Sequence, residues 1–457
     1  MKNNIIINIT DRKLLKILIL VWFFLLISIC MFDSSIATTT LTVEDVRRIA
    51  LKHNRTYLAA KEDVIKAQSD ITKARAGALP NITLNSNYSR NFKLSSFFVQ
   101  MGNEPPIEFK TGFNNEFRSS LSIQQSLWSG GQVFTALKIA KLYKKYSLEK
   151  EKEVKASIIY NAELLFYKTI LTQSNLQVLQ KAFEANSYNL EVVEKYYVKG
   201  TVSKFEVLRA KVEKSNLQPQ ILKAKSDLTL SQKRLKSFLG IDLNEDIVIV
   251  DTKDDTTLAN LLPLSSLIDA ALQNRPEIRQ SNYLTEIAKK GIRISKGDYL
   301  PKLNAVSSYN WSASSDNFTS RENNVRSWSA GINLSIPIFK GGSTRGEVKN
   351  SVATYHQALL NDKQLKDNVK LEVEESYDNM LQAKKTLDIQ GETIAEAEEG
   401  LKIANVRYKS GVGILLEVLS AQTALTQARN SLALATFVFR QARAQLKKAT
   451  TVDIDKK

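Results

Sequence analysis

The stretch YYVKGTVSKFEVLRAKVE, residues 196–213, returns 211 positions later as RYKSGVGILLEVLSAQTA, residues 407–424. Each copy contains an aromatic residue, a glycine three positions further on, and Glu-Val-Leu beginning six positions after that glycine. Long segments with helical spacing, rich in Lys, Glu, Gln, Ala and Leu, flank both copies. Glycine can end a helix in a left-handed conformation that other residues disfavour. The sequence therefore predicts that each copy is the bend of a helical hairpin.

The rest of the chain is also duplicated. Leu79-Pro80 matches Leu300-Pro301 at an offset of 221, and Gly130-Gly131 matches Gly341-Gly342 at an offset of 211. Because the offset changes between these landmarks, the first copy is expected to contain a longer loop around residues 103–113. The predicted units are a first repeat over 38–240, an equatorial linker over 241–263, a second repeat over 264–449 and a C-terminal tail over 450–457.

Each repeat is expected to contain a helix, two strands and two long helices. The first helix has helical spacing from about Val43 to Ala78 and ends before Pro80, which cannot continue it. Apolar and polar residues then alternate, most clearly in Ser327 to Ile338, as in a strand with one apolar face. The predicted strands cover about 81–91, 116–128, 302–312 and 326–339. The predicted long helices cover 132–199, 203–239, 343–410 and 414–449.

The N-terminus is expected to be a signal peptide over residues 1–37. Lys13 and Lys16 accompany an apolar run that extends to Ile29, and Ser35-Ile36-Ala37 fits the cleavage pattern of small residues. A retained membrane anchor is the alternative, although the apolar run is short for a spanning helix. Cleavage would remove Cys30, the only cysteine, so the mature chain would depend on packing and assembly rather than on disulfides.

The alternating strands are candidates for crossing a membrane. One such strand also fits the edge of a soluble sheet, but four of them, each about as long as a tilted spanning strand, favour a barrel. Aromatic residues stand near their ends, at Tyr88, Trp128, Trp311 and Trp328. Four strands cannot close a barrel, and open edges are not viable in lipid, so several chains must combine their strands. The residues alone leave both a dimer and a trimer open.

Taken together, these features resemble the TolC-like outer membrane factor family, the exit ducts of bacterial efflux pumps and type I secretion systems. The resemblance rests on the duplication, the two Leu-Pro pairs, the aromatic-any-Gly-Gly motifs at Trp128 and Phe339, and the two bends, and it covers essentially the whole mature chain. It implies an α+β membrane protein of the bacterial outer membrane with its helices in the periplasm. The implied assembly is a homotrimer, in which a 12-stranded β-barrel with four strands per chain continues into an α-helical coiled-coil barrel. A mixed equatorial belt is implied between Gly240 and Leu267 and at the termini.

The resemblance also implies partners and site residues. The bends become hairpin tips that dock a periplasmic adaptor (membrane fusion) protein and, through it, an inner membrane pump of the RND, ABC or a similar class; the barrel contacts outer membrane lipid. The implied docking residues are Tyr197, Lys199, Gly200, Thr201, Tyr408, Ser410, Gly411 and Val412. The strand-to-helix turns are expected at Gly130, Gly131, Gly341 and Gly342, where glycine permits a sharp turn.

Three residues are candidates for the gate of the tunnel: Glu206, Tyr408 and Glu417. Three copies of Glu417 around an axis would form an acidic ring that favours cations and can hold an iris shut. Helix N-terminal carboxylates favoured by the helix dipole, and a tyrosine packed at a bend, are the plain alternatives. The chain departs from the family pattern at Gly413, where an arginine can help to close the iris, and at Ser420, where a second carboxylate can stand.

Catalytic chemistry is not expected. His53 and His356 lack a second ligand or nucleophile nearby in the sequence, so no metal, no cofactor and no enzyme activity is predicted. The formal net charge is +17, but Lys and Arg are interleaved with Glu along helices, which does not indicate nucleic-acid binding. The predicted function is a passive export duct, with multidrug efflux, metal efflux and protein secretion all open. An envelope-spanning structural or adhesive coiled coil with a barrel anchor is the alternative.

Overall fold

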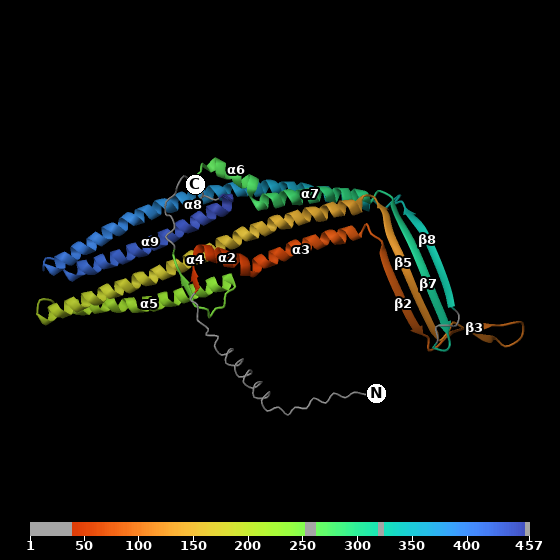
Figure 1. Ribbon diagram of the computed structural model, residues 1–457, viewed down its shortest axis with the longest axis horizontal. Coiled ribbons are helices and arrows are strands. Elements are labelled where there is room, and N and C mark those ends of the chain that lie inside the picture. The colour runs from red at the N-terminus through yellow and green to blue at the C-terminus, as the bar shows by residue number, and fades with distance from the viewer. Residues whose placement is uncertain (1–38, 252–261, 319–323, 453–457) are drawn as a thin grey trace, which may run out of the picture.

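The computed structural model describes residues 39–251, 262–318 and 324–452. Long helices run along the length of the molecule, and a sheet stands at one end (Figure 1). The signal peptide predicted over 1–37 lies outside the described residues.

The two repeats contain the same succession of elements. The first contains α2 (Val43–His53), α3 (Arg55–Ala76), β2 (Asn81–Arg90), β5 (Asn115–Ser129), α4 (Gln132–Val198) and α5 (Lys204–Leu239). The second contains α6 (Leu264–Asn274), α7 (Pro276–Gly297), β7 (Lys302–Ser315), β8 (Asn324–Ser335), α8 (Ser343–Lys409) and α9 (Leu415–Thr450). The paired long helices have equal lengths, 67 residues in α4 and α8 and 36 residues in α5 and α9.

The first predicted helix is in fact two helices, because Asn54 interrupts it. Asn54 has extended backbone angles, and its side-chain oxygen accepts hydrogen bonds from the amides of Thr56 (3.0 Å) and Tyr57 (3.3 Å), which caps α3. Its side-chain nitrogen donates to the Phe238 carbonyl near the end of α5 (2.8 Å). Asn54 therefore links the junction of α2 and α3 to the end of α5.

The prediction that the last strand extends to residue 339 is wrong. β8 ends at Ser335, which pairs with Lys302, the first residue of β7, so the partner strand offers no further residue. Pro337 follows, and it has no amide hydrogen to donate to a ladder. The longer loop expected in the first repeat contains a separate hairpin, β3 (Ser95–Val99) paired with β4 (Ile107–Thr111).

The four main strands form one antiparallel sheet in the order β2-β5-β7-β8. The central pair, β5 and β7, comes from different repeats and holds Leu121 opposite Tyr309. Among the described residues, β2 and β8 each pair with a single strand, so each leaves one edge open. The chain thus forms a curved segment of wall and not a closed structure (Figure 1).

Two apolar clusters attach short elements to the middle of the helical wall. In the first, β1 (Thr39–Leu41) pairs in parallel with β6 (Ile247–Ile249), and residues such as Leu41 and Val46 pack against Phe166 of α4. In the second, Leu267 of α6 packs with Val373 of α8 and Phe439 of α9. Part of the linker predicted over 241–263 is therefore ordered as β6, while 252–261 lies outside the described residues.

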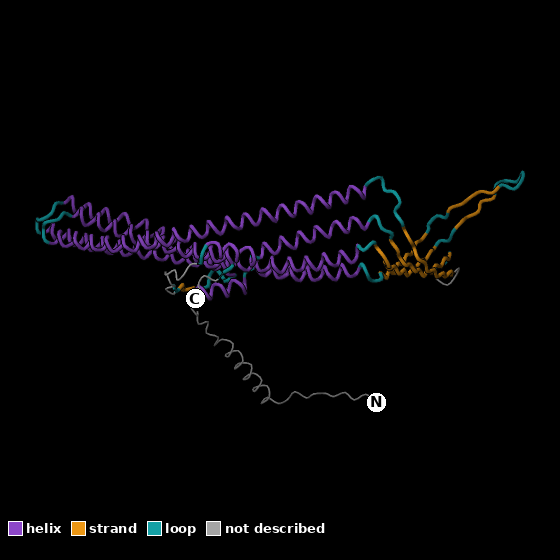
Figure 2. Tube along the Cα trace, turned by 90° about the horizontal axis from the view of Figure 1, so that it is seen from above, coloured by secondary structure: helices purple, strands orange, loops and turns teal. Residues whose placement is uncertain are grey.

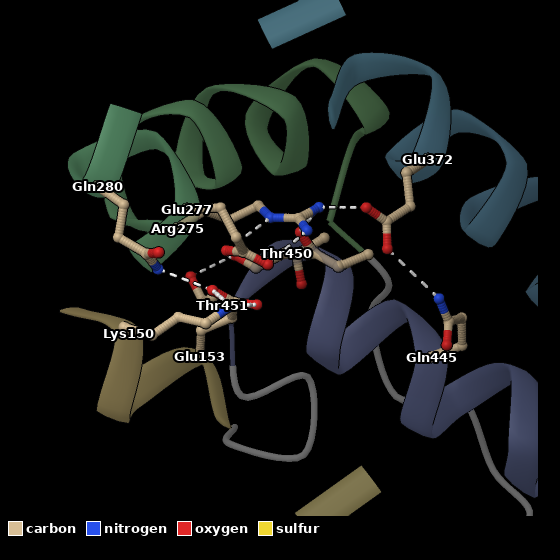
Figure 3. Close-up of polar contacts among 10 residues, drawn as sticks. Lys150, Glu153, Arg275, Glu277, Gln280, Glu372, Gln445, Thr450 and Thr451 are labelled. Atoms are coloured by element: carbon tan, nitrogen blue, oxygen red, sulfur yellow. Dashed lines mark hydrogen bonds and ion pairs between the residues drawn. The ribbon is translucent and has the colours of Figure 1, made fainter. Parts of the chain in front are cut away.

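Arg275, at the junction of α6 and α7, joins several helices at this level (Figure 3). Its guanidinium donates to Glu372 on α8 (2.6 Å), to Glu277 (2.9 Å) and to the Ala449 carbonyl near the end of α9 (3.4 Å). Burial opposes the charged form of Glu277, but the hydrogen bond and charge of Arg275 outweigh it, so the pKa of Glu277 is lowered. Both partners stay charged, and Arg275 fixes the start of α7 to the interior of α8 and to the C-terminal end of α9.

Candidate functional site: the paired hairpin tips

The two bends lie side by side at the end of the molecule far from the sheet (Figures 1 and 2). Gly200 and Gly411 end α4 and α8 with φ of +73° and +74°. The Thr201 amide donates to the Tyr196 carbonyl and the Val412 amide to the Arg407 carbonyl, each at 3.0 Å. These bonds close the same six-residue helix terminus in both tips, with glycine at the left-handed position that the sequence suggested.

Most residues of the expected docking set face solvent. At the α4–α5 tip the exposed members are Tyr197, Lys199, Gly200 and Thr201, and at the α8–α9 tip they are Ser410, Gly411 and Val412, the last with 73% of its surface exposed. Tyr408 differs, because it is only partly exposed and turns toward the other hairpin. The structure therefore separates the set into an exposed rim and one inward aromatic residue.

A small apolar cluster joins the two tips within one chain. Its buried members are Val193 and Ala210 from the first hairpin and Leu415 and Leu419 from the second. Tyr408 packs against this cluster, and its ring centroid lies 5.9 Å from that of Tyr196. The two hairpins are therefore held together at their ends by side-chain packing.

Glu206 and Tyr408, both gate candidates, come close together beside this cluster. Burial, with a further contribution from the negative charge of Glu206, raises the pKa of Tyr408 to about 12. The Tyr408 hydroxyl and Glu206 Oε2 are both buried, and neither has a hydrogen-bond partner among the described residues. At neutral pH the tyrosine is thus a protonated hydroxyl with a free donor.

Glu417, the third gate candidate, is paired with a residue that the sequence analysis missed. Arg407 Nε lies 3.2 Å from Glu417 Oε2. The close turn that brings them together depends on Gly413, whose amide donates to the Arg407 carbonyl (3.0 Å). A Cβ at Gly413 would lie 2.9 Å from Arg407 Cβ and 3.1 Å from Glu417 Oε2. Glu417 therefore forms an ion pair within its own chain, and the glycine at position 413 makes room for this pair. An arginine ten positions before a glutamate across a tight bend was the available signal.

The four glycines of the strand-to-helix turns all have left-handed backbones, with φ between +59° at Gly341 and +83° at Gly342. Their surroundings differ between the repeats. A Cβ at Gly130 would lie 2.6 Å from the Gly297 carbonyl oxygen, so the first turn packs closely on the end of α7. At Gly341 and Gly342 no described atom lies within 4 Å of the corresponding position.

Neither a metal centre nor a spanning helix is apparent in the described ranges. No group of His, Cys, Asp and Glu side chains there could hold a metal ion. Among the helices that the structure describes, none combines the length and the apolar character needed to cross a membrane.

The model of the outer membrane efflux protein family matches residues 46–241 and 267–451, and the chain belongs to this family. Nodulation protein T of Rhizobium leguminosarum bv. trifolii is 22% identical over 394 residues, which cover 84% of this chain and 79% of that protein. Outer membrane protein TolC of Vibrio cholerae is 20% identical over 396 residues, covering 86% of each. The alkaline protease secretion protein AprF of Pseudomonas aeruginosa is 20% identical over 408 residues, covering 88% and 83%.

Solved structures show the same fold. The CusC crystal structure matches with a TM-score of 0.74 and 19% identity, covering 89% of this chain and 91% of that one. The Campylobacter jejuni CmeC outer membrane channel matches with a TM-score of 0.73 and 18% identity, covering 90% and 87%. The predicted α+β fold of a TolC-like outer membrane protein is confirmed.

Proposed function

We propose that the protein is the outer membrane exit duct of a tripartite efflux pump or type I secretion system. In this role it conducts substrate passively, and the energy comes from an inner membrane pump. The observation that carries the proposal is the combination of two matched helical hairpins, packed tip to tip, with a four-stranded sheet that is open at both edges. The same arrangement requires neither a cofactor nor a catalytic group.

The open edges support a homotrimer with a closed 12-stranded barrel. Within the chain, β5 and α4 of the first repeat pack on β7 and α7 of the second repeat. The converse joint, from the end of the second repeat back to the start of the first, needs another copy. Gly77 of the first repeat is the counterpart of Gly297 in the second repeat. Likewise, Gly341 of the second repeat is the counterpart of Gly130 in the first. Gly341 of one copy is therefore the natural neighbour of Gly77 in the next, and the family resemblance favours three copies.

The exposed rim of the tips supports docking of a periplasmic adaptor protein. Val198 at the α4–α5 tip and Val412 at the α8–α9 tip are largely exposed apolar residues, 86% and 73%, and Lys199 adds a positive charge beside them. Apolar exposure of this kind is typical of an interaction surface when it is grouped at one place. The adaptor would connect the duct to an RND, ABC or similar pump.

The pump and adaptor would also determine the cargo. Relatives carry names as different as cation efflux system protein CusC and solvent efflux pump outer membrane protein SrpC, alongside the protease secretion protein. In this proposal the chain forms the wall of the duct and does not itself select the substrate. An envelope-spanning structural coiled coil would need neither the second tip nor the packing between tips.

The first test is capture of the partner in intact cells. A single cysteine at Ser410, in a chain with Cys30 replaced by Ser, would carry a crosslinker, and the captured proteins would be identified by mass spectrometry. The matched control is Ser69→Cys, which is exposed on α3. Capture of an adaptor and its pump from Ser410→Cys alone is expected. Capture of the same proteins from both positions, or of neither from a correctly assembled protein, would count against a docking tip.

A further inference from the structure

Among the residues that the structure describes, the hairpin formed by β3 and β4 has no counterpart in the second repeat, where only residues 316–323 of the sequence stand between β7 and β8. It is a separate two-stranded sheet, in which Phe97 pairs with Phe109 and Val99 with Ile107. The rings of Phe97 and Phe109 stack with their centroids 5.6 Å apart. The function proposed above does not account for this feature.

One face of the hairpin is continuously apolar at its centre. Because side chains alternate along a strand, Phe97, Val99, Ile107 and Phe109 share a face. Phe97, Ile107 and Phe109 expose 48%, 49% and 42% of their surface. The opposite face is mixed: Glu108 and Lys110 lie there beside Ser96 and Phe98, and Phe98 exposes 67% of its surface. A two-stranded sheet is marginally stable by itself in water, so this face is incomplete without a partner.

The direction of the hairpin restricts what can cover it. In Figure 1 it extends past the end of the four-stranded sheet, away from the helices. In Figure 2 it leaves the sheet toward the side opposite to the short elements near the C-terminus. The function proposed above takes these short elements as a belt around the outside of the tube, and in that arrangement the hairpin inclines toward the axis. The hairpin also lies beyond the end of the four-stranded sheet, which is the part of the proposed barrel that lipid would surround.

The size of the face restricts the partner further. A standard protein interface buries on the order of 800 Å² on each side, far more than four side chains offer. A face this small can contribute only where the association has already been achieved by other contacts, because the entropy of association is then not lost a second time. Neighbouring copies in one trimer meet this condition, whereas a separate partner would not.

We propose that the three hairpins of a trimer pack these apolar faces against one another and form a constriction over the outer mouth of the duct. This inference rests on the function proposed above, since it takes the trimer as given. The occupant of each face is the same hairpin of a second copy. The constriction is lined by aromatic and branched aliphatic side chains, so it would resist the passage of ions and water more than a polar loop would.

Crosslinking between copies tests the proposal. In a chain with Cys30 replaced by Ser, Val99→Cys places a thiol on the apolar face and Glu108→Cys places one on the opposite face of the same hairpin. Intact cells would be treated with a short bismaleimide, and products would be resolved on denaturing gels. We expect linked dimers from Val99→Cys at several times the yield from Glu108→Cys.

A parallel treatment with an amine-reactive crosslinker, which acts on the many surface lysines, reports whether the copies assemble at all. Assembly with equal or absent linkage at Val99 and Glu108 overturns the constriction and leaves the duct intact. Absence of assembly overturns both. Linkage of Val99→Cys to an unrelated protein in place of a second copy also overturns the inference.

Discussion

Arg407 changes the charge that Glu417 presents at the α8–α9 tip. Its pairing with Glu417 at 3.2 Å joins two side chains that are 51% and 42% exposed. Exposed pairs of this kind contribute about 0–1 kcal/mol to stability, so the pair matters more for local charge than for folding. The gate candidate Glu417 is therefore paired with Arg407, a residue outside the expected set.

Replacing Arg407 should make the duct more selective for cations. In Arg407→Gln the Glu417 carboxylate loses its partner, and an uncompensated negative charge at a narrow mouth attracts cations. We expect the ratio of cation to anion permeability to rise at least about twofold, measured as reversal potential across a bilayer in a KCl gradient. The double variant Arg407→Gln with Glu417→Gln should fall back toward the original ratio. An unchanged reversal potential in the single variant would show that Glu417 does not line the mouth.

Gly240 and Thr451 follow the ends of α5 and α9 at equivalent positions of the two repeats, but only Thr451 has a side chain. Both have left-handed backbones, with φ of +72° at Gly240 and +56° at Thr451. A non-glycine residue in this conformation is strained by about 1–2 kcal/mol. We expect Thr451→Gly to raise the thermal unfolding midpoint slightly, since relief of strain exceeds the added freedom of the unfolded chain.

The matched substitution is Gly240→Ala, which should lower the midpoint. There a Cβ would lie 3.0 Å from the His53 carbonyl oxygen, so steric conflict adds to backbone strain. Changes in the same direction for both variants would contradict the assignment of strain to Thr451.

Among the elements, the hairpins depend on a few buried residues where their tips meet. Leu415 is 1% exposed in the cluster with Val193, whereas the adjacent Leu416 is 40% exposed. Truncation of a buried leucine costs about 2–5 kcal/mol, and here the loss falls on the contact between hairpins. We expect Leu415→Ala to accelerate hydrogen exchange of the amides at both tips, with little effect from Leu416→Ala. Acceleration confined to the α8–α9 tip would show that the cluster does not couple the hairpins.

The sequence predicted the main elements of each repeat and missed the break in the first helix and the extra hairpin. The long helix predicted over 414–449 is present as α9, and the residues at helical spacing Leu415, Leu419 and Leu425 are buried in it, because such spacing depends only on local geometry. The break at Asn54 was missed because its cause is a hydrogen bond to Phe238, far away in the sequence. The segment of β3 and β4 was read as a loop, since each strand has only five residues and the chain between them contains Gly102, Pro105 and Pro106.

For the whole molecule, a substitution at Gly77 tests the proposed contact between copies without disturbing the fold of the single chain. A Cβ at Gly77 would make only ordinary contacts, the nearest at 3.5 Å from the Ala74 carbonyl oxygen, and its backbone is helical. If Gly341 of the next copy packs there, Gly77→Leu should abolish or strongly reduce the trimer while leaving helix content unchanged. Size-exclusion chromatography with light scattering would measure the assembly and circular dichroism the helix content. Ser69→Leu on the same helix is the control, and a Gly77→Leu trimer of normal yield would refute this joint.

The equal helix lengths impose a rule on how such a chain can change. Both 67-residue helices start from the sheet and finish at adjacent tips, and at about 1.5 Å per residue each is a ruler of roughly 100 Å. Adding one seven-residue repeat to a single helix would move its tip about 10 Å out of level and separate Tyr196 from Tyr408. Lengthening is tolerable only when all four hairpin helices grow together. Each of the two helices therefore sets the distance between the outer membrane and a docking partner, and the two helices must set the same distance.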